Sequence, residues 1–204
     1  DTAVTITTQT PAVCAVAAAG NVAGGPTTTV TLAASSTVST TFWVQGVEGA
    51  VGQCTLVATA IGYSDGSGSV DVVTAGVRII NLDAAPLDNA ADDPFDVEVG
   101  VPSADQATLA VVQQVRAGSA GLVVTVTNAN ATVAQLKSAT PPSPAQQVTV
   151  TVAAGSATSA GSGLAFDPLV PGGTTVEAVS PGLLSTDEAT QTIVVQDSSG
   201  VGCS

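Results

Sequence analysis

The sequence contains no histidine and only three basic residues, Arg78, Arg116 and Lys137, in a chain of 204 residues. Without histidine, the commonest general base and most transition-metal sites are unavailable. No Gly-x-Ser-x-Gly element, glycine-rich phosphate loop or metal-binding motif is present either. The 16 acidic residues give a net charge of −13, and such a surface repels the phosphates of nucleic acids. The sequence therefore predicts a protein that is neither an enzyme nor a nucleic-acid-binding protein.

Long apolar runs and aromatic side chains are also scarce. No stretch of 18 apolar residues occurs, so the sequence predicts no membrane span. Aromatic residues make up 2% of the chain, which leaves too few rings to line a sugar cleft. The chain is instead rich in alanine, valine, threonine and serine, with frequent glycine and proline, a composition typical of short, half-buried strands separated by turns. Together with the scarcity of lysine, this composition indicates a protein that persists outside the cell.

The chain contains an internal repeat with an offset of 120 residues. The repeated segments are VTITTQTPAV (4–13) with VTVTNANATV (124–133), TVTLAASS (29–36) with TVTVAAGS (149–156), and CTLVATAIGY (54–63) with TTVEAVSPGL (174–183). A local shift of about two residues relates the segment around Phe42 and Trp43 to GLAF in the second copy. GSVDVV (68–73) then lies near TQTIVV (190–195). Because the order and spacing are kept over about 75 residues, we expect each copy to form the same set of strands.

The sequence resembles the bacterial immunoglobulin-like (Big) tandem repeats of large surface proteins and adhesins. The resemblance lies in VTVTNANATVAQL (124–136), GLAFDPLVPGGTTVEAVSPG (163–182) and QTIVV (191–195), with their counterparts in the first copy. It implies an extracellular β-sandwich and specifies no ligand. We therefore expect an all-β fold of two tandem Ig-like β-sandwich domains, a partial one over 1–76 and a complete one over 77–196, with 197–204 as a tail or the start of a next unit.

The first copy lacks the early strands of the second. In isolation ATLAVVQQVRA (107–117) is compatible with a three-turn helix, but the glycine break and apolar run after it favour a strand. A sandwich without its early strands exposes an apolar groove and unpaired backbone groups. Three explanations remain open: a segment of a longer tandem protein that begins within a repeat, a sandwich closed by strands of a neighbouring chain, or a self-sufficient minimal sandwich.

The cysteines differ between the two copies. Cys14 aligns with Ala134 and Cys54 with Thr174, so both cysteines of the first copy are absent from the second. Paired presence and paired absence predict a disulfide between Cys14 and Cys54; two unrelated buried thiols are the alternative. Their spacing excludes a CxxC metal or redox motif. Cys203 is left over, and it is either an intermolecular disulfide partner or a free thiol on the tail.

Seven of the 16 acidic residues lie between residues 83 and 105. Clustered carboxylates at a domain junction suit calcium, which binds six to eight oxygens. Asp92, Asp93 and Asp96 are the candidate ligands, although their spacing matches no EF-hand loop. A solvated acidic loop is the alternative.

These features predict an extracellular or cell-surface structural module, which builds a stalk, fibre or filament through tandem or strand-complemented β-sandwiches. Its expected partners are copies of itself or adjacent repeats in a longer chain. The alternative function is an adhesin module that binds a cell-surface sugar or protein through loops at one end of the sandwich. In that case the adjacent Phe42 and Trp43 are candidate contacts, whereas the apolar counterpart segment favours a core or interdomain position for them.

Overall fold

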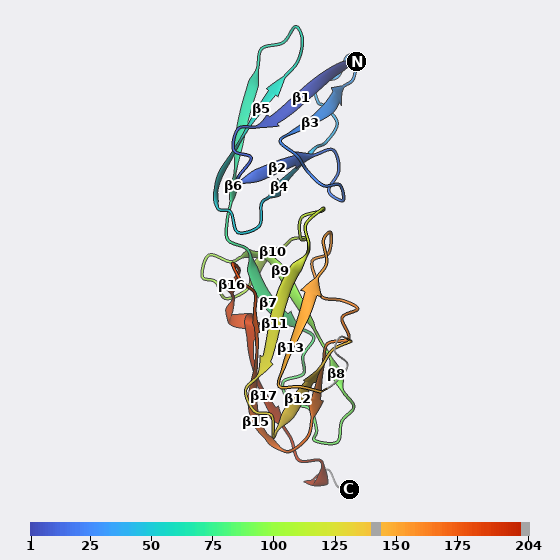
Figure 1. Ribbon diagram of the computed structural model, residues 1–204, viewed down its shortest axis with the longest axis vertical. Coiled ribbons are helices and arrows are strands. Elements are labelled where there is room, and N and C mark those ends of the chain that lie inside the picture. The colour runs from blue at the N-terminus through green and yellow to red at the C-terminus, as the bar shows by residue number, and fades with distance from the viewer. Residues whose placement is uncertain (140–143, 201–204) are drawn as a thin grey trace. The chain divides into compact units, whose positions relative to one another are not determined.

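The computed structural model describes residues 1–139 and 144–200, which fold into strands and two short 3-10 helices (Figure 1). The chain divides into two compact units. Unit 1 contains Asp1–Thr74 with Arg116–Ala120, and unit 2 contains Ala75–Val115 and Gly121–Ser204. The division at 74/75 lies two residues before the boundary expected from the repeat, and residues 197–200 belong to unit 2. The predicted all-β fold is confirmed. Within the described ranges, no helix is long and apolar enough to cross a membrane.

Unit 1 consists of six strands in two sheets. One sheet has the order β3-β1-β5-β6, and β2 pairs with β4 in the other. The strands are β1 (Thr2–Thr8), β2 (Cys14–Ala17), β3 (Thr27–Leu32), β4 (Trp43–Gly46), β5 (Gly52–Thr59) and β6 (Gly66–Val72). Apolar side chains alternate with threonine along β1 and β3, and the inward ones include Ile6 and Val30. This alternation gives each strand one apolar and one polar face.

Unit 2 repeats these strands and adds others. Its sheets have the orders β13-β11-β15-β17, β12-β14-β8 and β10-β9-β7-β16. The added early strands are β7 (Gly76–Ile80), β8 (Asp93–Pro94), β9 (Asp96–Pro102) and β10 (Leu109–Val112). The remaining elements are β11 (Leu122–Asn128), β12 (Ala134–Lys137), β13 (Gln147–Val152), β14 (Ala165–Pro168), β15 (Gly172–Val179), β16 (Leu184–Ser185), β17 (Thr190–Val195) and 3-10 turns at Asp187–Ala189 and Ser198–Gly200. The 107–117 segment thus contains strand β10 and no helix, as the glycine break favoured.

The pairing of the first strand with its two neighbours has the same register in both units. Thr2 pairs with Leu32 in unit 1, and Leu122 pairs with Val152 in unit 2, 120 residues later. The two-residue shift is confirmed, because β2 pairs with β4 through Cys14↔Gly46, whereas β12 pairs with β14 through Ala134↔Pro168. For the last strand the repeat indicated only an approximate position. Cys54 pairs with Val70 and Thr174 with Ile193, so the offset there is 123.

The cores of the two units differ in size. Unit 2 buries a large apolar cluster, to which the early strands contribute Val77, Ile79, Val97 and Val99. The fully buried core of unit 1 contains Ile6, Val16 and Val30, with several apolar side chains only partly covered around them. Alternating valine and isoleucine on β7 and β9 therefore complete the core of unit 2, and unit 1 has no corresponding strands.

Candidate functional site

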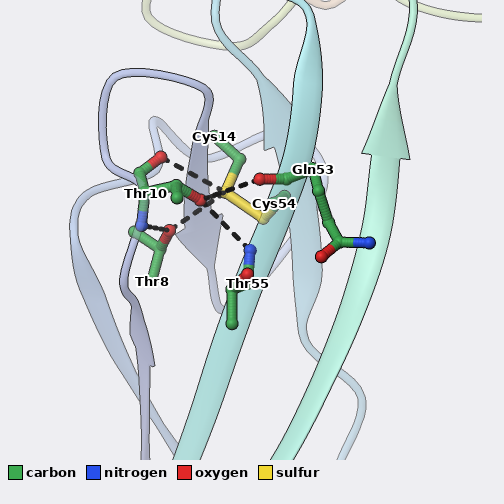
Figure 2. The surroundings of a disulfide bond; sticks show 6 residues. All are labelled: Thr8, Thr10, Cys14, Gln53, Cys54 and Thr55. Atoms are coloured by element: carbon green, nitrogen blue, oxygen red, sulfur yellow. Dashed lines mark hydrogen bonds between the residues drawn. A yellow bond between two sulfur atoms is a disulfide. The ribbon is translucent and has the colours of Figure 1, made fainter.

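A disulfide joins Cys14 of β2 to Cys54 of β5, with an S–S distance of 2.02 Å and a Cα–Cα distance of 5.7 Å (Figure 2). Both cysteines are fully buried, and the bridge connects the two sheets of unit 1. Residues of a strand alternate between its two faces, so Cys54 shares one face of β5 with Leu56 and Ala58. These two side chains pack against the core, and the face is therefore the inward one. The bridge is therefore a cross-link through the interior of unit 1.

Threonines surround the bridge (Figure 2). The Thr8 hydroxyl lies 3.0 Å from Cys14 Sγ, and it donates because a disulfide sulfur has no hydrogen. The Thr10 hydroxyl donates to the Gln53 carbonyl at 3.3 Å and accepts from the Thr55 amide at 3.1 Å. These bonds tie the turn after β1 to strand β5, which brings Cys14 next to Cys54.

Unit 2 has hydrogen bonds at the place of this bridge. Asn128, the counterpart of Thr8, is fully buried and accepts the Thr174 hydroxyl proton. Its side-chain amide donates to the carbonyls of Asn130 and Ala134. Thr174 and Ala134 are the positions that align with the two cysteines. A buried amide with its hydrogen bonds satisfied thus replaces a covalent bond. Asn128 was not predicted as a site residue, although it aligns with Thr8 at the offset of the repeat.

An open apolar groove lies on unit 1. Its volume is about 250 Å³, and it is lined by Ile6, Phe42, Leu56, Val57, Ala58, Gly66, Ser67 and Gly68. The lining contains no charged side chain. At the counterpart positions of unit 2, Val126, Leu164, Val176 and Ala178 are almost fully buried in the core. The apolar groove expected for a sandwich without early strands is present.

Phe42 and Trp43 are separated by the alternation of β4. Phe42 is partly buried against the core of unit 1, whereas Trp43 is 51% exposed. The Trp43 ring covers Gly20, where an added Cβ would lie 3.2 Å from ring carbons. Phe42 therefore has the favoured core position and Trp43 does not, whereas an interdomain position for Trp43 stays a prediction.

The candidate calcium ligands have separate partners. Asp92 accepts two hydrogen bonds from Lys137 Nζ, at 2.7 and 3.0 Å. Asp93 accepts from the Asp83 backbone amide at 2.7 Å, and Asp96 from the Ser159 hydroxyl at 3.1 Å. Within the described part of the chain, no group of three or more acidic or cysteine side chains is arranged to hold a metal ion. Calcium binding at these positions stays a prediction. Cys203 lies outside the described residues, so its disulfide also stays a prediction.

The main ionic cluster is centred on Arg78 of β7. Its guanidinium donates to Glu98 at 2.6 and 2.8 Å, to Glu188 at 3.0 Å and to the Thr108 hydroxyl at 3.0 Å. Glu98 raises the pKa of Arg78 above its ordinary value, and Glu188 adds to this effect. The pKa of Glu188 is lowered by the Thr108 hydroxyl first and by Arg78 second. The cluster ties the early strands to the segment before β17, and no pattern in the sequence indicates it.

The sequence matches no known protein family and no curated protein. The solved structures that are similar to the chain include two of surface-layer proteins. One contains domains 4–9 of surface layer protein SbsC, with a TM-score of 0.38 and 13% identity over 98% of this chain. The other contains domains 4 and 5 of the S-layer protein SbsC, with a TM-score of 0.36 and 12% identity over 95% of this chain. This chain spans 23% and 70% of the length of those structures, respectively. These similarities are too low to assign it to a family.

Proposed function

We propose that this protein is an extracellular structural module, whose tandem β-sandwich units form part of a stalk, fibre or filament at the cell surface. The observation that supports it most directly is that one six-strand arrangement occurs twice in the chain, and that its first strand pairs with both neighbours in the same register in each copy. Each repeat of this kind adds length without new chemistry. Kinship with bacterial Ig-like repeats, based on residues 124–136 and 163–182, is part of this proposal.

The disulfide and the surface chemistry support an extracellular setting. Disulfides form and persist in oxidising compartments, and the Cys14–Cys54 bridge is buried in the core of unit 1. The net charge of −13 keeps such a protein soluble. With three basic residues, the chain offers trypsin-like proteases few cleavage sites. The partners that we propose are copies of the chain or adjacent repeats of a longer polypeptide.

The proposed role is mechanical. Backbone hydrogen bonds between neighbouring strands hold each sheet together, and the bridge closes a segment with a sequence separation of 40. A fully extended chain spans at most about 3.3–3.6 Å per residue, so the bridge withholds roughly 130–140 Å of extension when unit 1 unfolds under load. Unit 2 has no bridge at the counterpart positions and extends fully.

Stretching single molecules by their two ends tests this role. We expect two unfolding events, of which the one from unit 1 lengthens by about 13–14 nm when reductant is added. The event from unit 2 is the internal control and keeps its length. Unfolding at forces too low to be resolved would contradict the mechanical role. Labelling of intact source cells with a membrane-impermeant reagent tests the location, and a chain that stays unlabelled would contradict it.

A further inference from the structure

We propose that unit 1 binds one extended apolar segment from another repeat of this kind, with the side-chain pattern of residues 76–100. This inference rests on the proposed structural function and names the partner of one of its surfaces. Unit 1 presents three features without a partner among the described residues: an apolar face, the outer edge of β4 and the outer edge of β6. In unit 2 a single segment covers all three counterparts.

The apolar face differs in exposure at matched positions. Val70 pairs with Cys54 in unit 1, and Ile193 pairs with Thr174 in unit 2. Val70 is 45% exposed, whereas Ile193 is fully buried. Leu56 is only partly buried, whereas its counterpart Val176 is fully buried. The inward side of unit 1 thus has apolar side chains like those of a core, and no strand packs over them.

The edge of β4 has a defined pairing partner in unit 2. There β14 pairs with β8 through Phe166↔Asp93, and the Phe95 amide donates to the Leu164 carbonyl at 3.2 Å. In unit 1 the sheet of β2 and β4 has two strands, so β4 has a strand neighbour on one side only. Such an edge is a template for an added strand.

The edge of β6 is matched in the same way. Along β17, the Val194 amide donates to the Ala84 carbonyl at 2.9 Å and the Gln196 amide to the Pro86 carbonyl at 2.8 Å. β6 is the last strand of its sheet, and no described residue pairs with its other side. Its side chains are nearly all exposed, in contrast to the alternating burial along β17.

The segment that covers these features in unit 2 has a simple chemistry. Its first strand directs Val77 and Ile79 inward, its middle part follows the edge of β17, and its last strand directs Val97 and Val99 inward. The groove of unit 1 has no charged lining, so the face of the ligand that enters it must be apolar. The occupant is therefore an extended segment of about 25 residues with alternating β-branched side chains and free backbone groups.

A synthetic peptide of residues 75–101 of this chain is the probe, because it has this chemistry. It is labelled with a fluorophore and titrated with the complete chain. We expect saturable binding and slower amide exchange, by at least tenfold, in both β4 and β6. A peptide with Val77→Asp and Val97→Asp is the control ligand, and we expect it to bind at least tenfold more weakly.

Variants of the chain locate the site. Leu56→Glu places a charge in the groove, whereas Thr59→Glu places it on the exposed outer face of the same strand. Binding is expected to weaken at least tenfold for Leu56→Glu and less than twofold for Thr59→Glu. Val70→Glu, on the exposed edge strand, repeats the test if Leu56→Glu does not fold.

Three outcomes overturn the inference: no saturable binding, binding unchanged by both Leu56→Glu and Val70→Glu, or a dimer in which unit 1 of a second copy, and not an extended segment, covers the groove. Unchanged binding would mean that the peptide enters unit 2 by strand exchange. These results leave the mechanical role untouched, because that role is tested by extension and surface labelling without the peptide.

Discussion

Replacing the disulfide by the residues that unit 2 uses at the same positions is expected to destabilise unit 1 alone. The double variant Cys14→Ala, Cys54→Thr reproduces Ala134 and Thr174. The bridge closes a segment with a sequence separation of 40, and the loop-entropy relation then gives about 4 kcal/mol at 25 °C. This exceeds the gain from one neutral hydrogen bond, which is about 1 kcal/mol.

The chain has a built-in reporter for this measurement. Trp43 is the one tryptophan of the sequence and lies on β4, where it pairs with Ala17 of the strand that contains Cys14. Its fluorescence therefore follows the unfolding of unit 1, whereas far-ultraviolet circular dichroism follows both units. With a urea slope of about 1 kcal/mol per molar for so small a unit, we expect the midpoint of the fluorescence transition to fall by about 4 M. If the unfolding free energy of unit 1 is below about 4 kcal/mol, the Trp43 fluorescence of the double variant is that of an unfolded unit even without urea.

The triple variant Thr8→Asn, Cys14→Ala, Cys54→Thr is the matched comparison, because it also supplies the counterpart of Asn128. In unit 2 this amide satisfies the groups around Ala134 and Thr174. We expect the triple variant to regain about 1–2 kcal/mol over the double variant, as new buried hydrogen bonds form. A midpoint shift below about 0.5 M for the double variant, or an equal shift of the unit 2 transition, would refute the reasoning.

Two further predictions concern unit 2. Gly100→Ala places a Cβ 2.2 Å from the Val111 carbonyl oxygen, so the unfolding free energy of unit 2 is expected to fall by about 1–3 kcal/mol in urea denaturation. Gly173→Ala, which meets no atom within 4 Å, is the control, and equal losses would contradict the clash. Because the Thr108 hydroxyl and Arg78 lower the pKa of Glu188 below its ordinary 4.5, this carboxylate stabilises unit 2 above about pH 4.5, and the contribution is lost as the pH falls through the lowered pKa. We expect Glu188→Gln to reduce the acid-induced loss of stability by less than about 1 kcal/mol, since the carboxylate is half exposed; an unchanged pH profile of the circular dichroism midpoint would show that Glu188 does not contribute.

Much of the fold could be predicted from the sequence because the two copies of the repeat can be aligned with each other. The alternating threonine and valine of 4–13 and 124–133 indicated strands, and the fixed offset related β1 to β11 and β5 to β15. The same comparison paired Cys14 with Cys54. These inferences depend on local patterns and on spacing, both of which a single sequence contains.

Other features depended on tertiary structure. Glu188 meets Arg78 across 110 residues, and no local pattern connects two such side chains. Trp43 is exposed although its neighbour Phe42 is not, since strand alternation decides which of the two faces the interior. Asn128 replaces the disulfide only because folding brings it to Thr174, 46 residues later.

Sequence alone determined that this chain is a repeated β-structure with one bridged copy, because strand periodicity, offset and paired cysteines are properties of the linear chain. Only the tertiary structure decided which surfaces of unit 1 remain open and which segment covers their counterparts in unit 2. The reason is physical: burial and edge pairing are relations between segments distant in sequence, and residues 76–100 reach β14 and β17 only in the folded unit.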